Sequence, residues 1–225
     1  MGQQSAAAWD VYREIHKAMR FALFGITTQA GAVDSGDDAA VAALLAEWKD
    51  VLMVLSGHHQ HEDDFCDGLI AVHAPDLRET LEAAHRDSDE SLANLNDLAT
   101  SIATANPADR WALVRAFHLD LADFTAAYMN HLRFEEDLVM PALNEALTDD
   151  QLAAVTNDIR TSVPPPEMCI FIRYMVPAMN PAERADMLRG MHQAPPEIFE
   201  MFRDAAERCL PADAYRRLAV DAGFA

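Results

Sequence analysis

Apolar residues recur every three or four positions through most of this sequence, the spacing that places them on one face of an α-helix. The first stretch shows it at Trp9, Tyr12, Ile15, Met19 and Leu23. Breaks rich in glycine or proline predict four long helices, over residues 5–30, 37–73, 75–105 and 107–144. Pro75 and Pro107 stand where a first helical turn tolerates proline, whereas Pro141 should bend or end the fourth helix.

Short connections between long helices favour antiparallel neighbours, so residues 1–147 are predicted to form an up-down-up-down four-helix bundle in an all-α fold. Residues 148–225 differ, because prolines divide them into shorter helices. Thr148 is placed to cap the first of these, and the run 164–166 of three prolines should form an extended break. This second region is rich in Met, Phe and Ile, which predicts a helical extension packed on the bundle, with a protein-interaction surface as the alternative.

Composition narrows the range of partners. The chain has 225 residues, of which 51% are hydrophobic, and 37 acidic against 17 basic residues give a net charge of −20. Such a charge repels phosphate backbones and anionic membrane surfaces, so neither nucleic acid nor membrane is an expected partner. The sequence has no signal-peptide pattern and no apolar run of about 18 residues. Three widely spaced cysteines make a disulfide framework unexpected, and a cytoplasmic location fits best.

Two segments carry the same candidate metal-binding motif. The segment 58–65 aligns without gaps with the segment 131–138, so that His58 matches His131 and Glu62 matches Glu135. Residues four apart lie one turn apart on the same helix face, where an imidazole and a carboxylate can bind one metal ion or two adjacent ions. Imidazole suits iron, copper and zinc, and a carboxylate can bridge two ions.

Two earlier histidines extend the repeat. His16 precedes His58 by 42 residues, and His85 precedes His131 by 46 residues, about one helical hairpin in each case. Two such halves, related by a pseudo-twofold axis, would bring four histidines and two glutamates together in the core. Helical bundles build metal sites in this way, from inward side chains on facing helices.

This pattern resembles the hemerythrin-like, or HHE cation-binding, domain family, over roughly residues 8–147. The segments 15–20 (IHKAMR) and 131–141 (HLRFEEDLVMP) look typical of that family. The resemblance implies a centre of two non-haem iron ions. It also implies the roles of six ligands: His16 and His58 on one iron, His85 and His131 on the other, and Glu62 and Glu135 bridging the two.

One position departs from the respiratory members of the family, which carry a second histidine one turn after the first on the third helix. Here Asp89 occupies it, four residues after His85. Three roles are open for Asp89: a seventh ligand, a hydrogen-bond partner that orients His85, or a solvated surface residue. A missing histidine ligand would open a coordination position, which favours reaction with peroxide or oxygen over reversible oxygen carriage.

Other residues near the motifs have weaker signals. His59 lies about 100° around the helix from His58 and is expected to face outward. His61 is expected at the surface or in packing, although it could edge the site. Tyr128 shares the face of His131 and Glu135, so it could line the pocket or simply fill the core. His118 and His192 are expected to lie away from the site.

Three classes of function follow. The leading one is a diiron protein that binds or reacts with dioxygen, hydrogen peroxide or nitric oxide, with a preference for peroxide turnover, as in a catalase-like enzyme, or sensing. The second is an oxidase or oxygenase of an organic substrate, which would need a larger cavity beside the metals. The third is a non-catalytic metal-binding or interaction module. The sequence indicates no redox partner.

Overall fold

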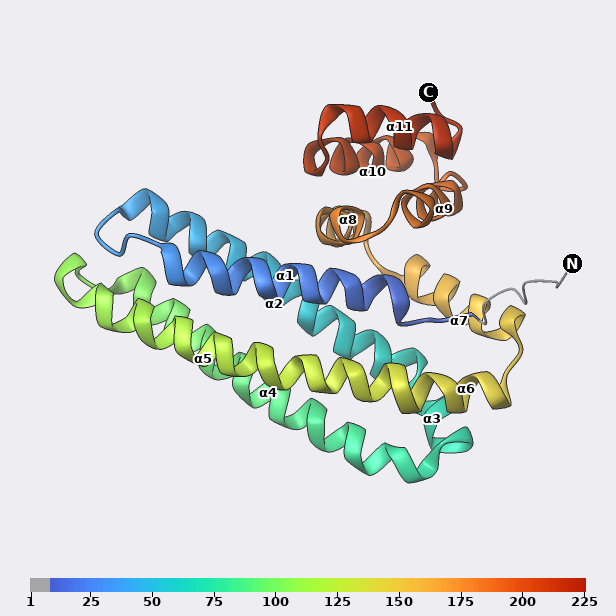
Figure 1. Cartoon of the computed structure of the whole chain (residues 1–225), viewed down its shortest axis with the longest axis horizontal. Coiled ribbons are helices and arrows are strands. Elements are labelled where there is room, and N and C mark those ends of the chain that lie inside the picture. Colours follow the sequence, from blue (N-terminus) through green and yellow to red (C-terminus); the bar gives the residue numbers. More distant parts are fainter. Residues whose placement is uncertain (1–8) are drawn as a thin grey trace, which may run out of the picture.

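The computed structural model describes residues 9–225, and its first two-thirds form a four-helix bundle (Figure 1). Four long helices make it: α1 (Arg13–Ala32), α2 (Asp38–Phe65), α4 (Pro75–Thr104) and α5 (Pro107–Phe134). Contacts join α1 to α2, α2 to α4, α4 to α5 and α5 to α1. The turns between consecutive helices are short, so neighbours run antiparallel. The predicted all-α, up-down-up-down fold with a helical extension is confirmed.

The start of α1 is set by Asp10. Its Oδ1 accepts hydrogen bonds at 3.0 Å from the backbone N–H groups of Tyr12 and Arg13, which have no partner within the helix. The helix was expected from residue 5. Residues 5–8 lie outside the described part of the chain, and residues 9–12 are not helical.

The second and fourth bundle helices are interrupted near the motifs. At Cys66 the chain kinks, and a short helix α3 (Asp67–His73) replaces the expected continuation of α2. Beyond α5 the chain passes through a π-helix η1 (Glu135–Val139) into α6 (Met140–Ala146). Pro141 lacks the N–H that an α-helix would need, and the wider π turn lies directly before it. Pro141 therefore accompanies a local change of helix type without ending the helix.

The C-terminal region is helical between its prolines. It comprises α7 (Asp149–Ser162), α8 (Pro165–Ala178), α9 (Pro181–Met191), α10 (Pro196–Cys209) and α11 (Ala212–Ala222). Thr148 caps α7 as predicted, in a reciprocal capping box with Gln151. The prediction that residues 164–166 form an extended break is wrong for two of the three prolines. Only Pro164 is extended, while Pro165 and Pro166 occupy the first turn of α8.

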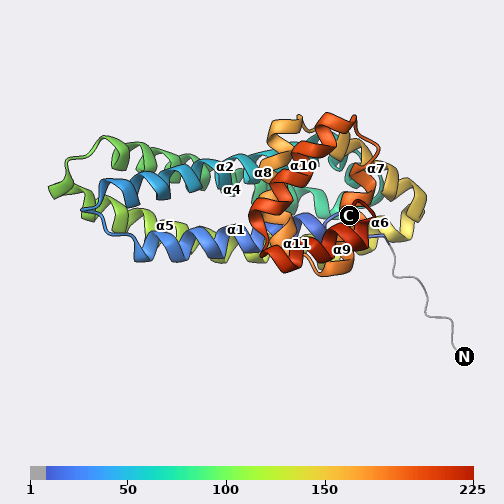
Figure 2. The same ribbon diagram turned by 90° about the horizontal axis from the view of Figure 1, so that it is seen from above.

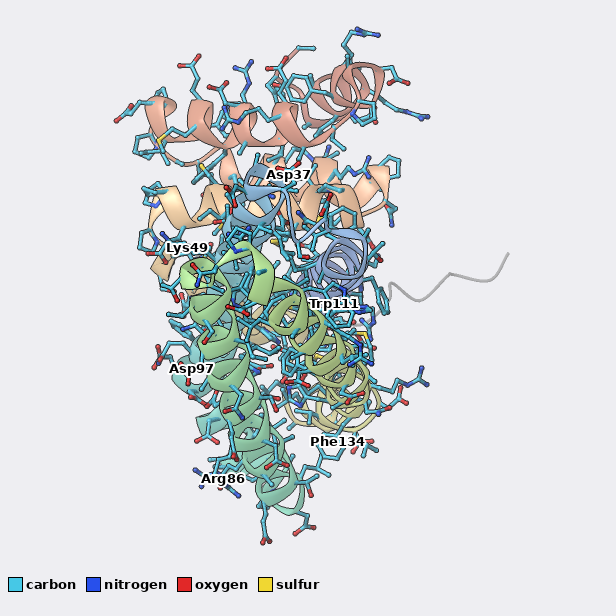
Figure 3. All side chains as sticks on the ribbon, turned by 90° about the vertical axis from the view of Figure 1, so that its left-hand side faces the viewer. Asp37, Lys49, Arg86, Asp97, Trp111 and Phe134 are labelled. Atoms are coloured by element: carbon cyan, nitrogen blue, oxygen red, sulfur yellow. The ribbon has the colours of Figure 1, made fainter. Side chains whose placement is uncertain are left out.

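The C-terminal helices lie on the side of the bundle formed by α1 and α2. Seen from above, α8 to α11 cover one half of the bundle's length and leave the other uncovered (Figure 2). Viewed toward the end of the bundle, they form layers above α1, with α4 on the far side (Figure 3). The Lys17 Nζ–Glu183 Oε1 distance is 2.6 Å, and the Tyr174 hydroxyl donates to Glu47 at 2.8 Å. One apolar cluster contains residues of both regions, and the division into domains 1–147 and 148–225 stays a prediction.

A polar layer crosses the bundle between two apolar clusters. The larger cluster includes Met19, Leu55, Leu92 and Leu132, and it extends into the C-terminal helices. The smaller cluster includes Tyr12, Cys66, Leu81 and Val139. His16, His58, His85 and His131, one on each bundle helix, lie at the level where one cluster gives way to the other. Glu62 and Glu135 lie at the same level. Within residues 9–225, none of the helices combines the length and hydrophobicity that a membrane crossing requires.

Candidate metal centre

The six predicted ligands meet in this polar layer. Their atoms form two groups, each within 4.8 Å, that a metal ion could occupy. One group contains His16 and His58, the other contains His85 and His131, and both contain Glu62 and Glu135. The side chains converge because α1, α2, α4 and α5 each carry one of the four histidines at the same level of the bundle. The assignment of these residues as ligands stays a prediction, since the structure establishes only that they lie together.

Glu62 faces both histidine pairs. Its Oε1 lies 3.5 Å from Nε2 of His58, one turn earlier on α2. Its Oε2 lies 3.3 Å from Nε2 of His85 on α4. The two oxygens of one carboxylate thus point toward different pairs.

Glu135 repeats the arrangement from the other side. Its Oε2 lies 3.2 Å from Nε2 of His16, and its Oε1 lies 3.3 Å from Nε2 of His131 and 3.8 Å from Nε2 of His85. Glu135 is the first residue of η1 and is 0% exposed. Together the two glutamates place one oxygen of each carboxylate beside each histidine pair.

These buried polar atoms fit a metal better than they fit one another. Within residues 9–225, no hydrogen-bond partner is found for Nε2 of the four histidines or for the carboxylate oxygens of the two glutamates. Buried polar groups left unpaired are costly and rare in folded proteins. Imidazole nitrogens and carboxylate oxygens that converge without pairing form a donor set that suits iron. The residues present therefore fit the implied ions.

Burial keeps two of the predicted ligands in the protonation state that binds metal. Burial lowers the pKa of His131 to about 3 and that of His58 well below its usual range. Both imidazoles are therefore neutral near neutral pH, the form that binds metal. Burial and the neighbouring Glu62 charge raise the pKa of the Glu135 carboxyl above its usual range, since two buried carboxylates repel each other without a cation between them.

Glu136 and Arg20 support His16. Glu136 Oε1 lies 3.0 Å from His16 Nδ1, the nitrogen that faces away from the centre. Arg20 donates two hydrogen bonds to the same carboxylate, at 2.7 and 2.9 Å. A carboxylate on the outer nitrogen fixes the orientation of a ligating histidine. Neither Glu136 nor Arg20 was among the predicted site residues, although the position of Glu136 directly after Glu135 was a signal for a supporting carboxylate.

His59 is the main error of the sequence analysis. It was expected to face outward, but it is 5% exposed and its ring stacks on His85, with centroids 4.8 Å apart. Its Nε2 lies 3.2 Å from the Tyr128 hydroxyl, and its Nδ1 lies 3.3 Å from Asp89 Oδ1. Asp89 is 70% exposed on its side chain and pairs with His59, not with His85. Tyr128, at 1% exposure, lies against both His59 and His131.

Three further histidines and Cys66, one turn after Glu62, lie in packing or surface positions. His61 is half-buried against Phe171 of α8, and Cys66 is buried in the smaller apolar cluster. Nε2 of His118 lies beside Gly31 at the far end of α1. His192 is exposed and stacks on Phe199 with centroids 4.6 Å apart. His118 and His192 are therefore remote from the polar layer, as expected.

An apolar cavity of about 100 Å³ adjoins the centre. His58 and Glu62 of α2 form part of its wall, together with Tyr12 and Ile15. The opposite wall comes from α7, α8 and α9. The C-terminal region thus forms one wall of a space beside the predicted ligands.

Comparison with known proteins identifies the bundle. The hemerythrin HHE cation binding domain matches residues 7–143, which is more than half of the chain and includes all six predicted ligands. Searches of curated proteins and of solved structures gave no match. The buried histidine–glutamate groups lie within the matched region. The chain therefore belongs to the hemerythrin HHE cation-binding family, and its bundle is a metal-binding domain.

Proposed function

We propose that the bundle holds two iron ions and that this centre reacts with a small oxidant. His16 and His58 would bind one iron, and His85 and His131 the other. Glu62 and Glu135 would bridge them. The observation that supports this most strongly is the position of the carboxylates, each of which presents one unpaired oxygen to each histidine pair.

Two adjacent irons, when bound, supply the electrons that dioxygen, hydrogen peroxide or nitric oxide accepts. The chain's own residues control access and protons around them. The apolar clusters above and below the polar layer exclude bulk water. The Tyr128 hydroxyl oxygen lies 3.2 Å from His59 Nε2, within hydrogen-bonding distance, beside the His85–His131 pair. We favour peroxide turnover or sensing over reversible oxygen carriage, because Asp89 stands where respiratory relatives have a further histidine ligand.

Metal analysis with an optical spectrum tests the proposal. Protein produced with added iron should contain two irons per chain, show the visible absorption of ferric iron in air and consume hydrogen peroxide. His131→Ala should bleach the absorption, whereas His118→Ala, remote from the centre, should leave it unchanged. One iron per chain, or none, overturns the diiron assignment.

Two other functions give different results in the same measurements. A non-catalytic module that holds zinc would be colourless and would leave peroxide untouched. An oxidase or oxygenase of an organic substrate is the second candidate, and the cavity lined by His58 and Glu62 favours it. Such an enzyme would consume oxygen faster when its substrate is present.

A further inference from the structure

The cavity beside the centre has the lining of a binding site for an organic molecule. Four of the chain's eleven methionines line it: Met168, Met175, Met187 and Met191. Phe171 and Val163 add to the same apolar wall. Unbranched, polarisable methionine side chains adapt to the shape of a bound molecule, which is why they are common on adaptable binding surfaces.

The size of the cavity exceeds the need of a diatomic molecule. Its volume is about 100 Å³. An apolar cavity of roughly 150 Å³ engineered into another protein holds benzene. The space here is smaller, so it suits a short alkyl chain, or a small ring with one edge toward the open side. The partly exposed side chains of Glu14, Thr156 and Arg160 also line it, and they mark the side that meets solvent.

One hydroxyl on the wall lacks a partner. Tyr12 lines the cavity and is 2% exposed, and its hydroxyl has no hydrogen-bond partner among residues 9–225. Its ring stacks on His16, with centroids 4.8 Å apart, which holds the phenol in place. A buried hydroxyl is usually paired, so an oxygen atom on a bound molecule would satisfy it.

We propose that this cavity binds a small apolar organic molecule with one hydrogen-bonding oxygen, its apolar body among the methionines and its oxygen on the Tyr12 hydroxyl. Bound there, the molecule lies against the wall formed by His58 and Glu62. Its role as a second substrate rests on the proposed diiron function, whereas its binding does not. Phenol and toluene are suitable probes, because they differ by one hydroxyl group in nearly the same shape.

Ligand-observed NMR titrations of the full-length, iron-loaded protein test the proposal. Both probes should bind. Tyr12→Phe should weaken phenol binding about fivefold, the effect of losing one hydrogen bond, and should change toluene binding by less than about twofold. An equal effect on the two probes overturns the role of the hydroxyl. If Tyr12→Phe loses a visible absorption band in the absence of phenol, the proposed role of the hydroxyl is also overturned. The hydroxyl would then bind the metal and not the organic molecule.

Two further variants test the cavity itself. Met175→Trp, at a half-buried position on the wall, should fill the space and abolish binding of both probes. Met201→Trp is the matched control on α10, where Met201 is 37% exposed and outside the lining, and it should bind as wild type. Phe171→Leu enlarges the cavity and should improve binding of the larger probe 2-naphthol, which gives a result even if Met175→Trp fails to fold.

The same titrations separate this proposal from the proposed function. A colourless, zinc-loaded protein that binds phenol through Tyr12 supports the cavity site while the diiron function fails. A protein with two irons that consumes peroxide but binds neither probe overturns the cavity site alone. Probe binding that Met175→Trp leaves unchanged also overturns it, because the probe would then bind elsewhere.

Discussion

The two histidine pairs of the centre lie in different surroundings, although the sequence repeats one motif for both. His16 and His58 belong to α1 and α2, which face the C-terminal helices, and their side chains are 0% and 5% exposed. His85 and His131 belong to α4 and α5 on the other side of the bundle (Figure 1). The His85 side chain is 13% exposed, whereas that of His131 is 4% exposed, so the difference in exposure lies at His85. We call these the covered half and the open half.

The carboxylates that follow each motif glutamate differ in the same sense. Glu136 lies 3.0 Å from the outer nitrogen of His16 and is itself held by Arg20. Asp63, at the matching position of the other motif, lies 3.9 Å from the outer nitrogen of His85 and is 65% exposed. The covered half therefore has a fixed, paired support, and the open half has a solvated one.

This difference indicates a division of roles. The sequence repeat gives both halves the same predicted ligands, but neighbouring helices decide which of these side chains is held rigidly and which is close to water. We expect the covered half to hold its metal more tightly. We expect small oxidants to reach the open half at the partly exposed His85, beside which His59 and Tyr128 stand. An organic molecule would reach the metals from the covered half, through the cavity lined by His58 and Glu62.

The largest expected effect comes from removing what the halves share. Glu135→Ala should lower the iron content from two per chain to less than one, because Glu135 contributes one oxygen to each half. Glu145→Ala, at an exposed position on α6, should retain two irons. Elemental analysis after desalting measures both. Two irons in Glu135→Ala would show that the halves bind metal independently of this carboxylate.

Removing the C-terminal helices, which cover α1 and α2, should destabilise the protein. Deletion after Val163 exposes the apolar surfaces of α1 and α2 that pack against α8, where Phe171 and Ile172 are buried. We expect the free energy of unfolding to fall by more than about 3 kcal/mol, since several fully buried apolar side chains contribute about 1.5–3 kcal/mol each. Urea unfolding and dye binding to exposed apolar surface measure this loss. A truncated protein that is monodisperse and equally stable contradicts the packed extension.

Much of the bundle was predictable because local signals coincide with global ones. Helical apolar spacing, proline at first turns and short connections all indicate antiparallel helices, and the structure has them. The boundaries near the centre were less predictable. The kink at Cys66 and the π-helix Glu135–Val139 occur next to the buried Glu62 and Glu135, so tertiary contacts outweigh local preference there.

The convergence of the predicted ligands was easier to predict than their surroundings. His58 and Glu62 share one face by spacing alone, and the repeat identified that face. His59 was misplaced because one inward stripe was assumed for α2. That helix contacts α1, α4 and α8, so a wider arc of its surface is buried. Tyr12 was read as an apolar contact, and its unpaired hydroxyl depends on neighbours from distant segments that spacing does not reveal.

A smaller effect should separate the two supporting carboxylates. Glu136→Gln removes the charge that orients His16 and pairs with Arg20, and it should weaken metal binding at least about tenfold. Asp63→Asn makes the matching change in the open half and should have much less effect, because Asp63 is 65% exposed. Competition with a chelator measures both affinities. Equal losses of metal affinity in the two variants would show that Glu136 and Asp63 support their histidines to the same extent. That result would contradict the difference between the covered and open halves.

The smallest expected effect concerns His59, which only the open half contains. His59→Phe keeps a ring of similar size beside His85 but removes both hydrogen-bonding nitrogens. The buried Tyr128 hydroxyl then loses its partner, which should destabilise the protein by about 1–3 kcal/mol. Asp89→Asn is the matched change on the other side of His59, and it should leave stability nearly unchanged because the Asp89 side chain is 70% exposed and its pairing is screened by water. Urea unfolding of the two variants decides the point. A larger loss in Asp89→Asn than in His59→Phe would assign the support of the open half to Asp89, which would restore Asp89 as a candidate for a direct role at the metal.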